Sequence, residues 1–143
     1  MNRIKCVLLA AVLLLATSAA FAGDITVKVT GIRGAKGGVI VHLWNAADGF
    51  PMGVDKAVAE QKTAIQGDTA TVVFKDVKPG TYAVRAIHDE NGNGKLDTNF
   101  MGKPKEGWGA SNNPHPKMRP PHFDEAQFTV TDANTTQTIA LIY

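Results

Sequence analysis

The feature that most restricts the fold is a series of short segments in which apolar residues recur at every second position, with turn residues between them. Residues 25–30 alternate apolar and polar side chains, and within 81–88 Tyr82 and Val84 fall on one face while Arg85 falls on the other. This period of two is typical of β-strands, because successive side chains of a strand point to opposite faces.

Other segments of the chain show the same short strand pattern, at 39–44, 57–63, 69–74, 127–131 and 136–142. Residues 39–44 are apolar on both faces, so we expect a central strand there. Residues 54–65 can also be written as a short helix, but their neighbours favour a loop that leads into a strand. About seven short strands and no strong amphipathic helix predict an all-β fold, a single antiparallel β-sandwich.

The first residues have the form of an export signal. Arg3 and Lys5 precede an apolar run at 6–16, and Ala20-Phe21-Ala22 is a small-x-small cleavage site. The run is shorter than the ~20 residues that span a bilayer. We therefore expect residues 1–22 to be a signal peptide and 23–143 to be a β-sandwich domain that is periplasmic or secreted. The lone cysteine, Cys6, would be lost with the signal.

The net charge of the expected mature domain argues against some classes of binding partner. The chain carries 15 basic and 13 acidic residues, and Arg3 and Lys5 belong to the predicted signal, so the expected mature domain is neutral. A neutral domain lacks the basic surface with which proteins attract nucleic acids or anionic membranes. We expect neither a nucleic-acid partner nor an integral membrane segment after cleavage.

A long connection at 89–123 interrupts the regular spacing, and it opens with a run of oxygen-bearing side chains. Ca²⁺ takes about six to eight oxygen ligands around a sharp turn. The run matches the early positions of a calcium loop, with Gly94 at the turn and with ligands from Asp89, Asn91, Asn93, the Lys95 carbonyl and Asp97. Phe100 stands where a bidentate glutamate belongs, and Glu106 or water could replace it. The alternative is that this run is only a hydrogen-bonded turn, since Asn-Gly and Asp-Glu-Asn-Gly favour turns without any ion. Both interpretations stay open.

The runs at 86–100, 102–109 and 111–113, together with the Pro-Gly-Thr-Tyr corner at 79–82, resemble the signature of domain of unknown function 2141, a family of exported bacterial proteins. The resemblance extends over nearly the whole expected mature chain. It implies a small prealbumin-like or immunoglobulin-like sandwich and assigns no activity. Because such sandwiches host many functions, the fold alone does not indicate one.

Other residues of the chain suggest alternative chemistry. Imidazole and thioether ligands suit copper, and the four histidines (His42, His88, His115 and His122) accompany Met101 and Met118, although their spacing is irregular. Ser111 is the one serine after the signal, and it lacks the flanking glycines of a nucleophile elbow. A carboxylate pair of Asp89 and Glu106 has no separation fixed by the sequence.

Three aromatic residues of the long connection, Phe100, Trp108 and Phe123, are expected mainly to cover the edge of the sandwich. Any aromatic surface left exposed would be a platform for a ligand. The sequence thus predicts an exported, non-enzymatic binding or accessory module with a protein, peptide or glycan ligand and a calcium-stabilised loop. The alternative is a small periplasmic enzyme or a copper-handling protein that uses the loop at 88–122.

Overall fold

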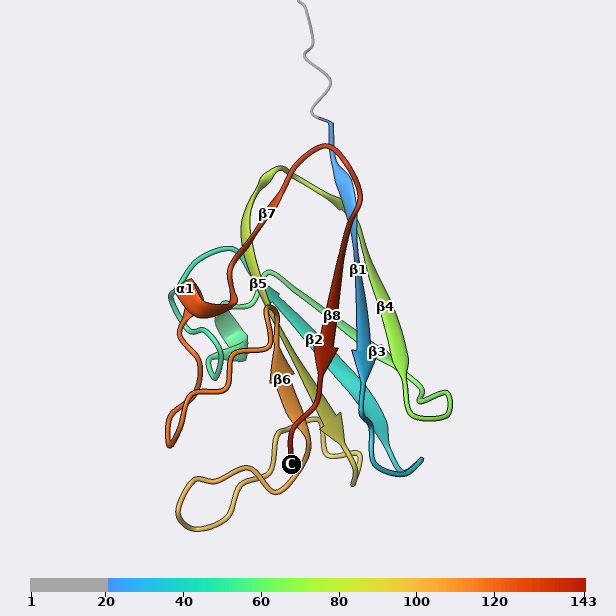
Figure 1. The fold of residues 1–143 in the computed structure, drawn as a ribbon, viewed down its shortest axis with the longest axis vertical. Coiled ribbons are helices and arrows are strands. Elements are labelled where there is room, and N and C mark those ends of the chain that lie inside the picture. The colour runs from blue at the N-terminus through green and yellow to red at the C-terminus, as the bar shows by residue number, and fades with distance from the viewer. Residues whose placement is uncertain (1–20) are drawn as a thin grey trace, which may run out of the picture.

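The computed structural model describes residues 21–143, which form two β-sheets packed face to face (Figure 1). The predicted signal peptide at 1–22 lies outside the described residues as far as position 20. The first sheet has the order β4-β1-β8, with strands at Ala70–Val77, Gly23–Thr30 and Thr135–Ala140. The second has the order β3-β2-β5-β6, with strands at Ala59–Thr63, Gly38–Trp44, Gly80–Asp89 and Trp108–Ala110, and β7 (Phe128–Val130) pairs with the beginning of β5. The helical elements of this part of the chain are a 3-10 turn, η1 (Val54–Lys56), and one helical turn, α1 (Phe123–Ala126). Neither is long and apolar enough to cross a membrane.

The space between the two sheets is filled by every second side chain of the facing strands. Ile25, Val27 and Val29 of β1 are fully buried there, and Val84 of β5 packs into the same cluster. This alternation places the apolar face of each strand inward, as its sequence period requires. The all-β sandwich is confirmed, and β2 is an inner strand of its sheet as expected.

One pair of strands departs from the expected antiparallel arrangement. β1 and β8 run parallel, from the pair Ile25 and Thr135 to the pair Thr30 and Ala140. The chain crosses from β7 in the second sheet to β8 in the first, and β8 therefore arrives beside β1 in the same direction (Figure 1). A period of two marks a strand but carries no information about its direction.

The outer face of the second sheet is also covered, so the protein has a third layer made of loops. Trp44 of β2 is fully buried on this face, and its ring meets that of Phe50 edge-on at a centroid distance of 5.2 Å. Phe50 meets Phe123 in the same way at 5.9 Å. In Figure 1 the segments carrying η1 and α1 lie beside β5 on the side away from the first sheet. This layer explains why β2 is apolar on both faces.

The long connection differs from the predicted loop in two respects. It contains a short strand, β6, that pairs with Arg85, Ala86 and Ile87 of β5. This strand was not predicted, because three residues beside glycines show no readable period. The predicted burial of Phe100 is wrong, since its side chain is 98% exposed.

Candidate functional site

The segment that begins at Asp89 curls tightly around the carboxylate of Asp89. One oxygen of that carboxylate accepts hydrogen bonds from the backbone N–H groups of Gly92 and Asn93, at 3.0 and 3.2 Å, and the other accepts from Gly94 at 2.8 Å. Gly92 and Gly94 have φ angles of 75° and 79°, a region in which glycine is far less strained than other residues. The exposed Lys95 continues the curl by donating its N–H to the Asn93 side-chain oxygen at 3.0 Å. The predicted sharp turn is thus present.

Three of the predicted ligand side chains meet, those of Asn91, Asn93 and Asp97, whereas the Asp89 side chain bonds only backbone N–H groups. The side-chain amide of Asn91 donates to the Asp97 carboxylate at 2.6 Å, and that of Asn93 donates to its two oxygens at 2.8 and 3.0 Å. These bonds, from Asn93 first and then Asn91, lower the pKa of the Asp97 carboxyl. The carboxylate of Asp97 is therefore held ionised inside the curl.

Glu106 folds back to this loop from nine residues beyond Asp97, and it is buried with 4% of its surface exposed. Its carboxylate accepts the backbone N–H of Glu90 at 2.9 Å with one oxygen and that of Asp97 at 3.0 Å with the other. Glu106 thus joins the beginning and the end of the curl. The remaining predicted member of the loop, Phe100, takes no part, because its side chain points to solvent.

The arrangement fits a calcium ion only in part. The side chains of Asp89, Asn91, Asn93 and Asp97 gather in one turn, but the oxygens of Asp89 and Glu106 accept backbone N–H bonds. The two asparagines direct N–H groups at Asp97, whereas calcium would need their oxygens. Among residues 21–143, no three His, Cys, Asp or Glu side chains are grouped so as to hold a metal. Calcium binding therefore stays a prediction, with the turn as a self-sufficient alternative.

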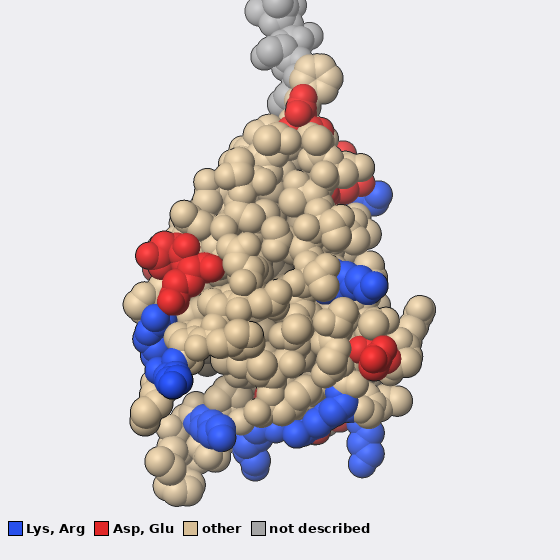
Figure 2. Space-filling model, in the orientation of Figure 1, with Lys and Arg blue, Asp and Glu red and all other residues tan. Residues whose placement is uncertain are grey.

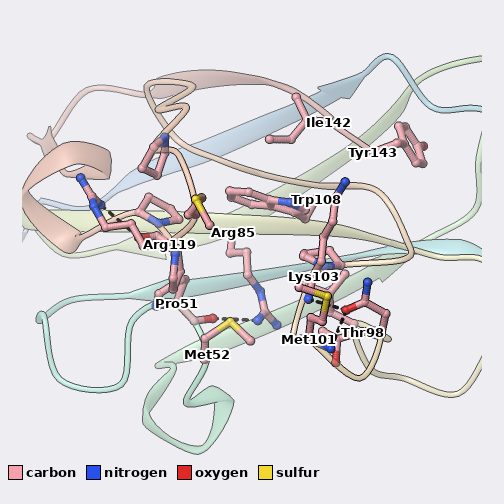
Figure 3. A pocket seen from close by; sticks show the side chains of 18 residues that line it. Pro51, Met52, Arg85, Thr98, Met101, Lys103, Trp108, Arg119, Ile142 and Tyr143 are labelled. Atoms are coloured by element: carbon pink, nitrogen blue, oxygen red, sulfur yellow. Dashed lines mark hydrogen bonds between the residues drawn. The ribbon is translucent and has the colours of Figure 1, made fainter.

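A cavity of about 600 Å³ opens between the long connection and the outer face of β5 and β6 (Figure 3). Its walls come from three loops and the end of the chain, and they are mostly apolar: Pro51, Met52, Leu96, Met101, Pro104, Trp108, Pro116, Met118, Pro120, Pro121 and Ile142. Small-molecule sites have volumes of about 300–1,000 Å³ and predominantly apolar walls with a few polar groups. In size and lining the cavity is of that kind, although its methionines, Met52, Met101 and Met118, are exposed at its mouth, by 54%, 78% and 105%.

Arg85 is the buried polar side chain among the described residues that line this cavity. Its side chain leaves β5 on the outer face of the sheet and extends toward Pro51 and Met52, with only 4% of its surface exposed (Figure 3). One terminal nitrogen donates to the Pro51 carbonyl at 2.7 Å, and the other contacts Nδ1 of His42 at 3.4 Å. The guanidinium also lies 5.7 Å from the ring centroid of Trp44. Burial lowers the pKa of Arg85 to about 10, which leaves it charged at neutral pH.

His42 connects this buried charge to the surface. Because Nδ1 accepts from Arg85, Nε2 carries the proton and donates to the exposed carboxylate of Glu60 at 2.8 Å. Burial first, and then the charge of Arg85, lower the pKa of His42, and Glu60 offsets part of that effect. His42 is therefore neutral, and its ring lies between the Arg85 guanidinium and the Glu60 carboxylate, which do not bond each other directly.

Two buried side-chain donors in the described part of the chain have no acceptor, the Arg85 Nε–H and the Trp44 indole N–H. They belong to side chains in contact with each other. Such groups are few in native proteins and cost free energy, and one of the two, the Nε–H, belongs to Arg85, which lines the cavity.

The other charges around the cavity are also basic. Its charged lining residues are Arg85, Lys103 and Arg119, with no Asp or Glu among the lining residues. Arg119 is neutralised by a bidentate pair with Glu125 at 2.8 Å, which lowers the Glu125 pKa to about 2. Figure 2 shows basic side chains gathered at the end of the molecule where the long loop lies. The charged side chains that line the cavity are thus all basic, and its walls are mostly apolar.

The other predicted candidates have structural surroundings. Ser111 is fully buried, donates its hydroxyl to the Ala126 carbonyl and accepts the Val84 N–H at 3.0 Å. His88 is fully buried on the opposite face of β5 from Arg85, between Tyr143 and the Lys36 carbonyl. His115 and His122 are exposed in the 111–122 loop.

Sequence reasoning noted that Arg85 lies opposite the core-facing residues of its strand but did not select it as a site residue. The available signal was that Arg85 has apolar neighbours on both sides in the sequence. The structure pairs it with His42, which lies in the strand predicted to be central. Trp108, predicted to cover the sandwich edge, is half-buried in a wall of the cavity, and Phe123 is partly buried against Phe50.

Comparison with known proteins gives one match. A family model described as "Uncharacterized protein conserved in bacteria (DUF2141)" matches residues 27–138. No curated protein and no solved structure matches the chain.

Proposed function

Since the chain belongs to this bacterial family, DUF2141, whose description names no activity, we propose from its geometry that it is an exported, non-enzymatic binding module. Its ligand has an apolar body that occupies the cavity between the long connection and β5. The observation that supports this proposal is the cavity itself, about 600 Å³ with apolar walls. A glycan would need more polar partners than these walls offer, so a small apolar ligand is favoured over the glycan, peptide or protein partners expected from the sequence.

We propose no catalytic activity because the side chains that could act as a nucleophile or base are hydrogen-bonded to the backbone. The Ser111 hydroxyl is buried between two backbone groups that it bonds. The carboxylates of Asp89 and Glu106 bind backbone N–H groups of the loop. A nucleophile or general base must reach a substrate, and these groups hold the fold instead.

Export forms part of the proposal because the first residues have the form of a signal peptide. The test is the intact mass of the protein recovered from outside the cytoplasm. Material that begins at Gly23 would support export, and material that retains residues 1–22 would contradict the predicted cleavage.

Methionine methyl groups give a direct test of binding. The chain has four methionines, and three of them, Met52, Met101 and Met118, line the cavity. In protein labelled at the methionine methyl carbon, the neutral probe decanol should shift all three resonances with one saturation curve. Decanol that leaves all three unmoved up to its solubility limit would contradict the proposal.

A blocking variant gives the matched control. Thr98 lines the cavity and is exposed at its rim, so Thr98→Trp should fill the entrance and weaken decanol binding. Thr71 is exposed on β4 in the other sheet, and Thr71→Trp should bind as the wild type does. Equal binding by the two variants would place the decanol elsewhere on the protein.

Copper handling is the second candidate, because thioethers suit Cu(I) and three of them surround the cavity. Against it, the buried Arg85 would repel a cation. Cu(I) added alone to the labelled protein distinguishes the two functions. Stoichiometric shifts of the three methyl groups with Cu(I), and none with decanol, would favour copper.

A further inference from the structure

We propose that the ligand of this cavity carries a single carboxylate, which pairs with the guanidinium of Arg85 while the apolar remainder contacts the methionine and proline walls. This inference rests on the binding function proposed above and adds the chemical class of the ligand, an amphipathic monocarboxylate.

The charge of Arg85 is not balanced by an ion pair within the described residues. No carboxylate of the described residues forms a salt bridge with it, and the network reaches Glu60 only through the neutral His42. A buried charge is expensive unless it is paired, and pairing inside a protein requires an anion. The apolar cavity in front of the guanidinium is where an anion from solution would enter.

The same guanidinium also has N–H groups without an acceptor. A guanidinium has five N–H bonds in a planar fork, and the structure gives acceptors to only two of them, the bonds to Pro51 and His42. Nε–H is among those without an acceptor. A carboxylate can accept two parallel N–H bonds from such a fork, which makes it a geometrically suited partner.

Arg85 is already held in place by its neighbours. Its Cα lies in β5 between β2 and β6, and the guanidinium is fixed by the Pro51 carbonyl, by His42 and by the ring of Trp44. A ligand would therefore meet an ordered donor and would not have to order a mobile side chain, which is a main cost of binding. The Pro51–Arg85 bond is drawn among the lining side chains in Figure 3.

The composition of the cavity distinguishes a monocarboxylate from other anions. Arg119 is already paired with Glu125, so Arg85 is the one buried lining residue that offers an unpaired positive charge in the described chain. A dianionic phosphate would bring one negative charge more than this guanidinium balances, and the lining cation that could offset the second charge, Lys103, is exposed to solvent. The apolar walls require a ligand with a substantial hydrocarbon body.

Calorimetric titration of three probes that share one tail tests the inference. Decanoate, decanol and decylammonium differ in head-group charge and present the same hydrocarbon to the walls. The wild type should bind decanoate at least about tenfold more tightly than decanol, and decylammonium most weakly.

Matched arginine variants assign the preference to one side chain. Arg85→Met keeps an apolar side chain in the cavity and removes the donors, so its preference for decanoate over decanol should disappear. Arg33→Met makes the same change at an exposed arginine that does not line the cavity and is paired with Glu90 at 2.8 Å, and it should retain the preference within about twofold. Arg85→Lys, which keeps the charge without the fork, should show an intermediate preference.

The three probes test the carboxylate preference separately from the binding of an apolar ligand. A wild type that binds decanol as tightly as decanoate overturns the carboxylate inference and leaves the binding function standing. A wild type that binds none of the probes overturns both. Because the wild-type comparison decides alone, the inference is testable even if Arg85→Met does not fold, and retention of the preference in a folded Arg85→Met would also overturn it.

Discussion

Replacing Glu106 by glutamine should loosen the curled loop without unfolding the sandwich. The Glu106 carboxylate is buried and accepts one N–H at each end of the curl, from Glu90 and from Asp97. Glutamine keeps one acceptor oxygen, and its amide NH₂ would face the other N–H. One charge-assisted bond is lost and a buried donor is left unpaired, at a cost of about 2 kcal/mol.

Native-state hydrogen exchange in chelator measures this loss where it arises. A cost of about 2 kcal/mol should speed exchange of the Glu90 and Asp97 amides by roughly 30-fold. Glu90→Gln is the matched control in the same loop, because its carboxylate is partly exposed and pairs with the exposed Arg33 at 2.8 Å. That variant should change exchange only slightly, since exposed pairs contribute at most about 1 kcal/mol. If Glu106→Gln and Glu90→Gln speed the exchange of these amides equally, Glu106 does not hold the two ends of the loop together.

The other predictions concern the ion, the core and the buried histidine. Calcium should raise the melting midpoint of the wild type by a few degrees relative to chelator, and that of Asp97→Asn by less, with an affinity of roughly 10⁻⁴–10⁻³ M; identical curves would leave the loop a hydrogen-bonded turn. Val84→Ala should lower the free energy of unfolding by about 1–3 kcal/mol in urea denaturation, because Val84 is fully buried between the sheets; an unmoved midpoint would contradict that burial. The pKa of His42, followed by its ring resonances, should lie below about 6.5, because burial and the charge of Arg85 oppose protonation. The neutral His42 then stabilises the fold fully above about pH 6.5, and this stabilisation is lost as the pH falls toward the pKa of His42 in the folded protein. In that pH range the wild type should lose more stability than His42→Gln. A His42 ring that titrates at or above about 6.5 would contradict the expected lowering of its pKa.

The strands could be predicted because the residues within each strand show which side chains are buried. Val27 and Val29 alternate with polar residues, and the alternation by itself identifies a half-buried strand. The direction of β8 beside β1 could not be predicted, because it depends on how the chain crosses between sheets after β7. The three residues of β6 are too few to show a period, and they form a strand because β5 offers them a free edge.

The site was harder to predict than the fold because its parts are distant in sequence. The curl from Asp89 to Asp97 is local, so spacing alone indicated which side chains would meet. The cavity is lined by β5, by a loop that precedes β5 in the sequence and by loops that follow it. Nothing in the sequence spacing of Pro51 and Met101 indicates that they line the same cavity. Phe100 shows the opposite error, since an aromatic residue was expected to be covered and the loop leaves it in solvent.

The most direct test of the account is the Arg85 Nε–H resonance during titration with decanoate. If the cavity binds a carboxylate through this guanidinium, that resonance should shift to saturation, and the decanoate tail should show nuclear Overhauser contacts to the methyl groups of Met52 and Met101. If Nε–H stays unmoved while decanoate saturates the protein, or if the tail contacts lie outside the cavity, the central claim is wrong.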